Sequence, residues 1–173
     1  KGVGALYVRR GVRLEPLLHG GGHEHGLRSG TLNTTAIVGF ARAVEITSRA
    51  EASAQAALRD ALVERLLESL DGASLNGPRH DRLCNHVSLT LARGEARLLL
   101  LALSRQGIYV SAGSACASGH TAPSRALLAI GLTPDEARRT IRVSLGRWTG
   151  VEDIDAVVAA LQALTQMPTG ENA

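Results

Sequence analysis

The chain has 173 residues, 45% of them apolar, which is enough for a buried core of Leu, Val, Ile and Ala because aromatic residues make up only 2%. No apolar run approaches the ~18 residues that a membrane span needs, so we expect no membrane association. The net charge of +3 is small and the arginines are dispersed, which disfavours nucleic-acid binding.

The two cysteines, Cys84 and Cys116, lack the spacing of a zinc site or of a disulfide framework. No charged-then-apolar leader opens the sequence, and we therefore expect reduced thiols in a cytoplasmic protein. Lys1 is the only lysine, and the sequence begins with it inside a strand-like pattern. We interpret the chain as a fragment of a longer protein.

The first 18 residues predict two short extended segments. Residues 5–8 (ALYV) form an apolar run between glycines and arginines, which favours a strand. Residues 12–18 favour a second segment, and Pro16 would place it at a sheet edge.

A glycine-rich segment, HGGGHEHGLRSGT, follows at residues 19–31. Three histidines there permit a metal interpretation: His19, His23 and His25. A glycine-rich loop pre-organises ligands poorly and no fourth ligand is evident, which weakens that interpretation. The alternative is anion binding, because Arg28, Ser29 and Thr31 precede the expected start of a helix.

A long helical pattern begins at Asn33 or Thr34, both good N-caps, and continues to Asp71-Gly72, with or without a kink near Thr47-Ser48. Its apolar positions favour core packing. The polar stretch at 46–52 is where we expect the chain to cross between two domains.

Helices and strands then alternate. We expect a strand at 86–91, a helix at 94–106, a short strand at 107–110, a capping box at 133–136, a strand at 140–145 and a helix from about 151 to 164. Period two in the strand at 140–145 places Arg142 and Ser144 on one face and the apolar residues on the other. The pattern predicts an α/β fold class, with an α+β arrangement in the smaller part.

The segment at 111–119, SAGSACASG, consists of Ser, Ala and Gly around Cys116. Small side chains bury little area, so this pattern predicts a loop that can move. Cysteines are often buried and inert, and on this loop alone a structural thiol competes with a reactive one. His120 follows four residues later and is either an assisting base or an ordinary surface histidine.

Four blocks in this order, KGVGALYV, HGGGHEHGLRSGT, SAGSACASGHTAPSRALLAIGL and TIRVSLGRWT, cover nearly the whole chain. Together they resemble the C-terminal part of the NifS/IscS-like cysteine desulfurases, fold-type I members of the pyridoxal 5'-phosphate (PLP) dependent aminotransferase superfamily. The resemblance implies PLP as cofactor, L-cysteine as substrate, a homodimer, and sulfur delivery to an acceptor or an iron–sulfur scaffold protein.

The resemblance also implies residue roles. Cys116 matches the nucleophile that attacks the substrate's sulfur and carries it as a persulfide. Arg142 matches the arginine that holds the substrate carboxylate, a role that suits a planar guanidinium on a strand. Thr31 matches the threonine that contacts the cofactor phosphate of the opposite subunit.

One departure is important. The family's Schiff-base lysine lies in a His-Lys pair upstream of the KGVGAL block, so Lys1 matches a later lysine. We therefore expect residues 1–50 to end the large PLP-binding domain and 51–173 to form the small domain that carries the cysteine loop. By itself, this chain is expected to be inactive.

Three other functions remain open from the sequence. One is a selenocysteine or cysteine-sulfinate lyase of the same fold. Another is a non-catalytic sulfur-carrier or scaffold module that binds an iron–sulfur assembly partner. The third is a metal-binding domain that uses the histidines of 19–31.

Overall fold

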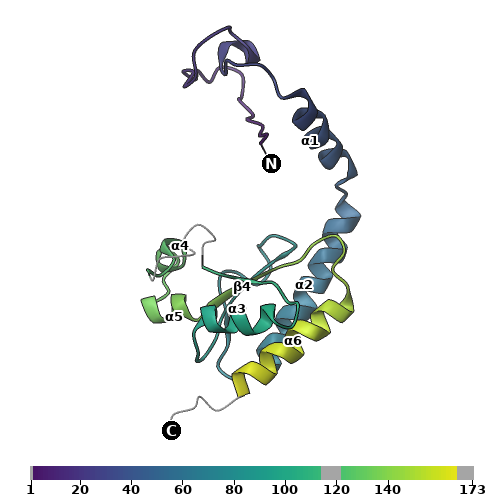
Figure 1. Ribbon diagram of the computed structural model, residues 1–173, viewed down its shortest axis with the longest axis vertical. Coiled ribbons are helices and arrows are strands. Elements are labelled where there is room, and N and C mark those ends of the chain that lie inside the picture. The colour runs from purple at the N-terminus through teal and green to yellow at the C-terminus, as the bar shows by residue number, and fades with distance from the viewer. Residues whose placement is uncertain (1, 114–121, 167–173) are drawn as a thin grey trace. The chain divides into compact units, whose positions relative to one another are not determined.

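A computed structural model describes residues 2–113 and 122–166, and Figure 1 shows the order of its elements. The chain forms two compact units, Lys1–Ser48 and Arg49–Ala173. That these units are parts of a large and a small domain remains a prediction.

The first unit has little regular structure before its helix. A single 3-10 turn spans Glu24–Gly26, and α1 spans Thr34–Ile46. Asn33 caps α1, because its side chain accepts a hydrogen bond from the Ala36 backbone N–H at 3.1 Å. The expected strands at 5–8 and 12–18 are wrong. The described residues offer them no partner strand, and the side chains of Leu6 and Tyr7 are 78% and 87% exposed.

The predicted long helix is two helices. α1 ends at Ile46, where Thr47 adopts an extended conformation and its hydroxyl donates to the Ala43 carbonyl at 2.9 Å. α2 then begins at Arg49 and runs to Ser69. A β-branched hydroxyl residue that binds the preceding turn competes with helix propagation, which explains the break at the expected kink.

The second unit contains four short strands. They are β1 (Ser74–Leu75), β2 (His86–Thr90), β3 (Ser111–Ala112) and β4 (Thr140–Ser144). The sheet order is β1-β2-β4-β3, and all neighbouring pairs are antiparallel. β2 and β4 confirm the strands predicted from period-two patterns. The strand expected at 107–110 is wrong, because the pairing with β4 begins only at Ser111.

The remaining helices are α3 (Ala96–Ser104), α4 (Arg125–Ala129), α5 (Pro134–Arg138) and α6 (Val151–Gln166). The predicted capping box of α5 is present: Glu136 N–H donates to Thr133 Oγ1 at 3.3 Å, and Thr133 N–H donates to Glu136 Oε2 at 2.7 Å. Within the described residues, no helix is both long and apolar enough to cross a membrane.

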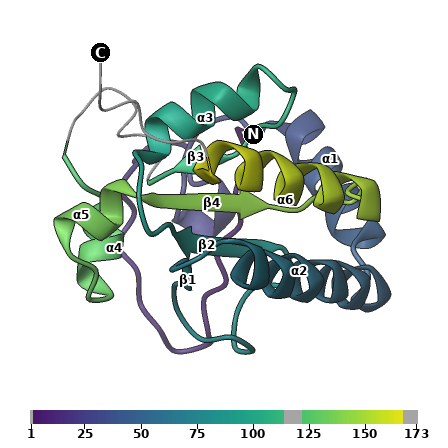
Figure 2. The ribbon, with the colours of Figure 1, turned by 90° about the horizontal axis from the view of Figure 1, so that it is seen from below.

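Helices α2, α3 and α6 cover one face of the sheet, as Figure 2 shows. The core between these layers consists of aliphatic side chains, including Leu62 and Leu66 of α2, Leu103 of α3, Leu161 of α6, and Val87, Leu89 and Ile141 of the strands. Burial of these side chains stabilises the unit by the ~1.5–3 kcal/mol each that is typical of fully buried aliphatic residues. This packing leaves the other face of the sheet to polar side chains.

Candidate functional site

The polar face of the sheet carries the candidate site. Alternation along β2 and β4 places a set of polar side chains opposite the core: His86, Ser88 and Thr90 on β2, and Thr140, Arg142 and Ser144 on β4. The face therefore combines a guanidinium, an imidazole and several hydroxyls on rigid strands.

Half of this face is closed by hydrogen bonds. The Asn76 amide donates to Ser88 Oγ at 3.1 Å, and the Thr90 hydroxyl donates to the Asn76 amide oxygen at 3.0 Å. The Thr90 and Thr140 hydroxyls lie 2.8 Å apart, and Thr140 also donates to the Glu136 carbonyl at 2.8 Å. These satisfied, buried groups fix the two strands and leave little capacity for a ligand.

Arg142 lies in the other half. Its register partners are Ser88 on β2 and Ser111 on β3, so small side chains flank it on both sides. Arg142 is half-buried, and among the residues that the structure describes its side chain has no hydrogen bond or ion pair. A guanidinium in this state can accept a carboxylate in a bidentate manner.

Two more cationic groups stand near this part of the sheet. Arg82, in the loop before β2, donates from Nε to the Pro78 carbonyl at 2.6 Å and from Nη2 to the Asn76 carbonyl at 2.8 Å. Its Nη1 is buried and has no partner within residues 2–113 and 122–166. Burial and the nearby charge of Arg59 lower the pKa of Arg82. The positive potential here favours an anionic ligand.

Arg59 of α2 is itself neutralised. It is 5% exposed, and its guanidinium pairs with Asp60 at 2.7 Å and donates to the Leu83 carbonyl at 2.9 Å. It therefore supports the loop that carries Arg82 and is not available to a ligand.

Sequence reasoning identified Arg142 but missed His86, Ser88 and Ser111. The alternation of HVSLTL did indicate that His86 and Ser88 share a face. Which neighbour that face would meet depends on the β2–β4 and β3–β4 register, and the sequence alone does not contain it.

Thr31 belongs to the first unit, Lys1–Ser48. It is exposed, two residues before the Asn33 cap of α1. Ser29, the buried member of the same segment, accepts a hydrogen bond from the Gly22 N–H at 3.3 Å, while Arg28 donates to the Ser29 carbonyl. Thr31 and Arg28 are thus the exposed members of the predicted anion-binding set, and Ser29 is the buried one.

Cys116 and His120 lie outside the described residues, as does Lys1. The residues on either side of 114–121 are close together, because a Cβ placed on Gly113 would lie 3.6 Å from the Cβ of Ser124. Gly113 has a φ of +58°, a conformation that favours glycine, directly after β3. The segment that contains Cys116 therefore starts beside the strand that pairs with Arg142.

The metal interpretation gains no support from the geometry. In the described parts of the chain, no three His, Cys, Asp or Glu side chains are grouped so that they could hold a metal ion. His23 instead accepts a hydrogen bond at Nδ1 from the Gly30 N–H at 3.3 Å.

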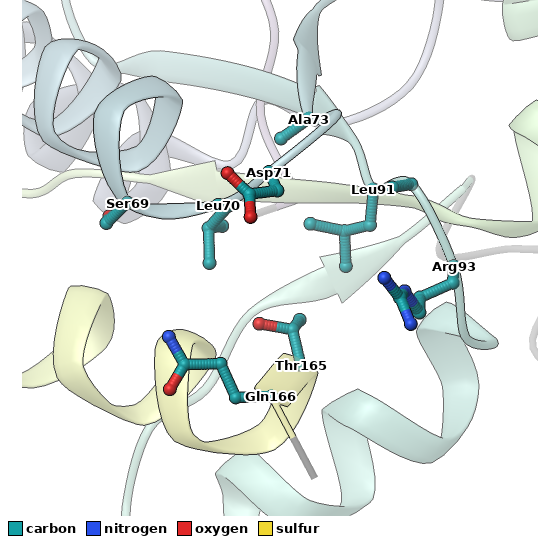
Figure 3. Close-up of a pocket in the computed structure, with 9 residues that line it drawn as sticks. Ser69, Leu70, Asp71, Ala73, Leu91, Arg93, Thr165 and Gln166 are labelled. Atoms are coloured by element: carbon teal, nitrogen blue, oxygen red, sulfur yellow. The ribbon is translucent and has the colours of Figure 1, made fainter. Parts of the chain in front are cut away.

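A cavity of about 200 Å³ lies at the ends of α2 and α6, away from the polar face. Figure 3 shows Asp71, Arg93 and Gln166 at its rim. Three of its polar groups are explained locally, since Ser69 and Thr165 bond to the preceding turns of their own helices and Gln166 ends α6. None of the predicted site residues lines it.

Comparison with known families gives one model, described as aminotransferase class-V, that matches residues 1–157. The chain belongs to the aminotransferase class-V family. A cysteine desulfurase of this kind, IscS 1 of Archaeoglobus fulgidus, is 43% identical over 169 residues, which are 96% of this chain and 44% of the relative. The chain thus spans about two fifths of the length of such relatives.

Solved structures agree with this membership. A NifS-like protein superposes with a TM-score of 0.77 at 35% identity, covering 91% of this chain and 40% of the other. A structure described as SspA in complex with cysteine superposes with a TM-score of 0.55 at 35% identity, covering 79% of this chain and 37% of the other. The expected fold class and the expected family are both confirmed.

The described residues fit a class-V aminotransferase cofactor in one place. A phosphate needs hydrogen-bond donors, and the exposed Thr31 hydroxyl before a 13-residue helix supplies one at a helix N-terminus. The Arg142 guanidinium suits the carboxylate of an amino-acid substrate. In the printed sequence the only lysine is Lys1.

Proposed function

We propose that the protein carrying this chain is a PLP-dependent cysteine desulfurase, which converts L-cysteine to L-alanine and holds the released sulfur as a persulfide on Cys116. The observation that carries the proposal is the state of Arg142: a half-buried guanidinium on a rigid strand, flanked by serines, with no acidic partner among the described residues. The names of the similar proteins supply the reaction class.

Each of the three predicted residues has one task. Arg142 would hold the substrate carboxylate through two parallel N–H···O hydrogen bonds, and this fixes the amino acid's orientation. Thr31 would contribute one hydrogen bond to the phosphate of PLP. When bound, PLP supplies the electron sink for bond cleavage at the amino-acid carbons.

Cys116 would receive the sulfur. A thiol must be deprotonated to attack, and it must also deliver its cargo to an acceptor. Cys116 follows Ser111, the register partner of Arg142, by five positions, and an extended chain of that length spans at most about 18 Å. This reach is compatible with a thiol that meets a substrate bound at Arg142.

Two finer parts of the proposal concern partners. We expect a homodimer in which Thr31 serves the opposite subunit's cofactor, and a sulfur acceptor such as an iron–sulfur scaffold protein in the cytoplasm. Both follow from the resemblance of the LRSGT and SAGSACASG blocks.

The test uses the longer protein that carries this chain, loaded with PLP and supplied with L-cysteine. Cys116→Ser should abolish persulfide formation and sulfide release while PLP remains bound. Arg142→Gln should raise KM by about 10- to 100-fold, because it removes charge-assisted hydrogen bonds worth ~1.5–3 kcal/mol. Arg138→Gln, which removes an exposed ion pair of α5, is the matched control and should leave KM unchanged.

Full turnover of cysteine by Cys116→Ser would refute the persulfide role. Turnover of selenocysteine but not cysteine by the unaltered protein would favour the lyase alternative. Absence of PLP from the purified longer protein, with binding to a scaffold protein retained, would favour the non-catalytic alternative.

A further inference from the structure

His86 has no role in the function proposed so far, yet it lies beside Arg142. On β2 it pairs with Ser144, while Arg142 on β4 pairs with Ser88. The two side chains are thus diagonal neighbours on the same face, a separation that long side chains bridge. Both side chains are half-buried, so solvent surrounds neither of them completely.

Two arginines, Arg142 and Arg82, act on the His86 imidazole. Burial is the largest cause that lowers the pKa of His86, followed by the charge of Arg142 and then that of Arg82, while a hydrogen bond to its own backbone acts in the opposite direction. At neutral pH the ring is therefore uncharged, with one nitrogen as donor and the other as acceptor.

The charged groups of every neighbouring element support this picture. β4 supplies Arg142, and the loop before β2 supplies Arg82. Arg59 of α2 lowers the pKa of Arg82, and Asp60, which pairs with Arg59, acts on Arg82 in the opposite direction. β1 and β3 contribute Ser74, Leu75, Ser111 and Ala112, none of which titrates in this range. No described acid therefore offsets the field at His86.

A bound carboxylate would change that field. Its negative charge next to Arg142 cancels part of the positive potential that keeps the imidazole neutral. The pKa of His86 must then rise, and by linkage the carboxylate must bind more tightly at a pH where the ring can take up a proton.

We propose that His86 is a proton-coupled positioning residue of the Arg142 site, a neutral imidazole that gains a proton from solvent when a carboxylate binds to the Arg142 guanidinium. The resulting imidazolium adds a second positive charge beside the anion. The inference rests on the proposed function only in taking Arg142 as the carboxylate-binding group.

The sign of the pH effect follows directly. The affinity for a carboxylate increases as the pH falls through the pKa of the bound state and stops increasing below the pKa of the free state. Only one proton is involved, so the affinity changes about tenfold for each unit by which binding raises the pKa of His86.

The experiment uses the 173-residue chain and sodium acetate as the probe. The imidazole resonances of all histidines are titrated by NMR from pH 4.5 to 8, with and without saturating acetate. The affinity for the acetate anion, corrected for the fraction of acetate that is protonated at each pH, is measured over the same range. We expect the pKa of His86 to rise with acetate.

Three variants complete the test. His86→Gln keeps a hydrogen-bonding side chain but cannot titrate, so its affinity for the acetate anion should be independent of pH. Arg142→Gln should raise the pKa of His86 in the free chain and abolish the response to acetate. His80→Gln, the matched control, should behave like the unaltered chain.

The outcomes separate the two proposals. Acetate that shifts the Arg142 side-chain resonances but leaves the pKa of His86 unchanged would refute the role of His86 and leave the proposed function intact. Acetate that causes no shift at Arg142 up to molar concentration would refute the role of His86, because no carboxylate would then bind at Arg142, and the proposed function would still be decided by the longer protein's turnover of cysteine. A pH-dependent affinity that persists in His86→Gln would assign the proton to another group and refute the proposal.

Discussion

The two faces of β4 place neighbouring residues in opposite environments, an apolar core on one side and a polar surface on the other. Ile141 and Val143 are buried in the aliphatic core, whereas Arg142 between them is half-buried and has no hydrogen-bond partner in the described part of the chain. Thr140 is intermediate, a polar group on the polar face that is only 2% exposed and fully hydrogen-bonded. In this sheet, burial and satisfied hydrogen bonds mark the residues that stabilise the fold, and an unpaired cation marks the residue that is free to bind.

The largest expected effect belongs to the core face. Ile141→Ala should lower the free energy of unfolding by about 2–5 kcal/mol, because it leaves a cavity between the sheet and the helices. Urea denaturation of the 173-residue chain measures this loss. A loss below about 1 kcal/mol would mean that the core side of β4 is not tightly packed.

The buried hydroxyl network comes next. Thr140→Val removes one partner and should cost about 1–3 kcal/mol, because the remaining polar groups are left without a hydrogen bond in a buried position. The double variant Thr90→Val/Thr140→Val should cost less than the sum of the single variants. Additive costs in that cycle would show that the two hydroxyls do not interact.

A smaller effect concerns pH. The pKa of His86 is lowered in the folded state, so the unfolded chain binds more protons at mildly acidic pH. This contribution to stability is fully present above the unfolded value of about 6.5 and is lost as the pH falls through the folded-state pKa. Urea denaturation as a function of pH should show a flatter acidic limb for His86→Gln than for the unaltered chain or for His80→Gln.

The smallest expected change in stability is at the binding residue itself. Arg142→Gln should alter the free energy of unfolding by no more than about 0.5 kcal/mol, because no ion pair or hydrogen bond among the described residues is lost. The same variant should lose carboxylate binding. A loss of stability above about 2 kcal/mol would place Arg142 among the structural residues and remove the contrast between the two faces.

The sequence predicts the parts of this molecule that depend on local pattern. Period-two alternation correctly placed β2 and β4, and the Thr133–Glu136 spacing correctly predicted the capping box of α5. Local pattern failed where a partner decides the outcome. Residues 5–8 have strand-forming side chains but no described strand to pair with, and the short strand near 107–110 is displaced because its pairing with β4 starts at Ser111.

The candidate site shows the same division. Arg142 could be identified from one block of sequence that resembles a known family, and Thr31 and Cys116 were assigned in the same way and remain predictions. His86 could not be identified, because its relation to Arg142 arises from antiparallel register between residues 56 positions apart. The residues of either strand alone do not predict this register.

The nearness of Gly113 and Ser124 has a consequence for how this protein could be altered. Since a Cβ at Gly113 would lie 3.6 Å from the Cβ of Ser124, the chain leaves the described fold and re-enters it at almost the same point. For a flexible connection between two such fixed points, polymer theory sets the penalty for doubling its length at only about 0.6 kcal/mol. By this estimate, selection or an engineer could change the length of the sequence between these points at little cost to the packed sheet.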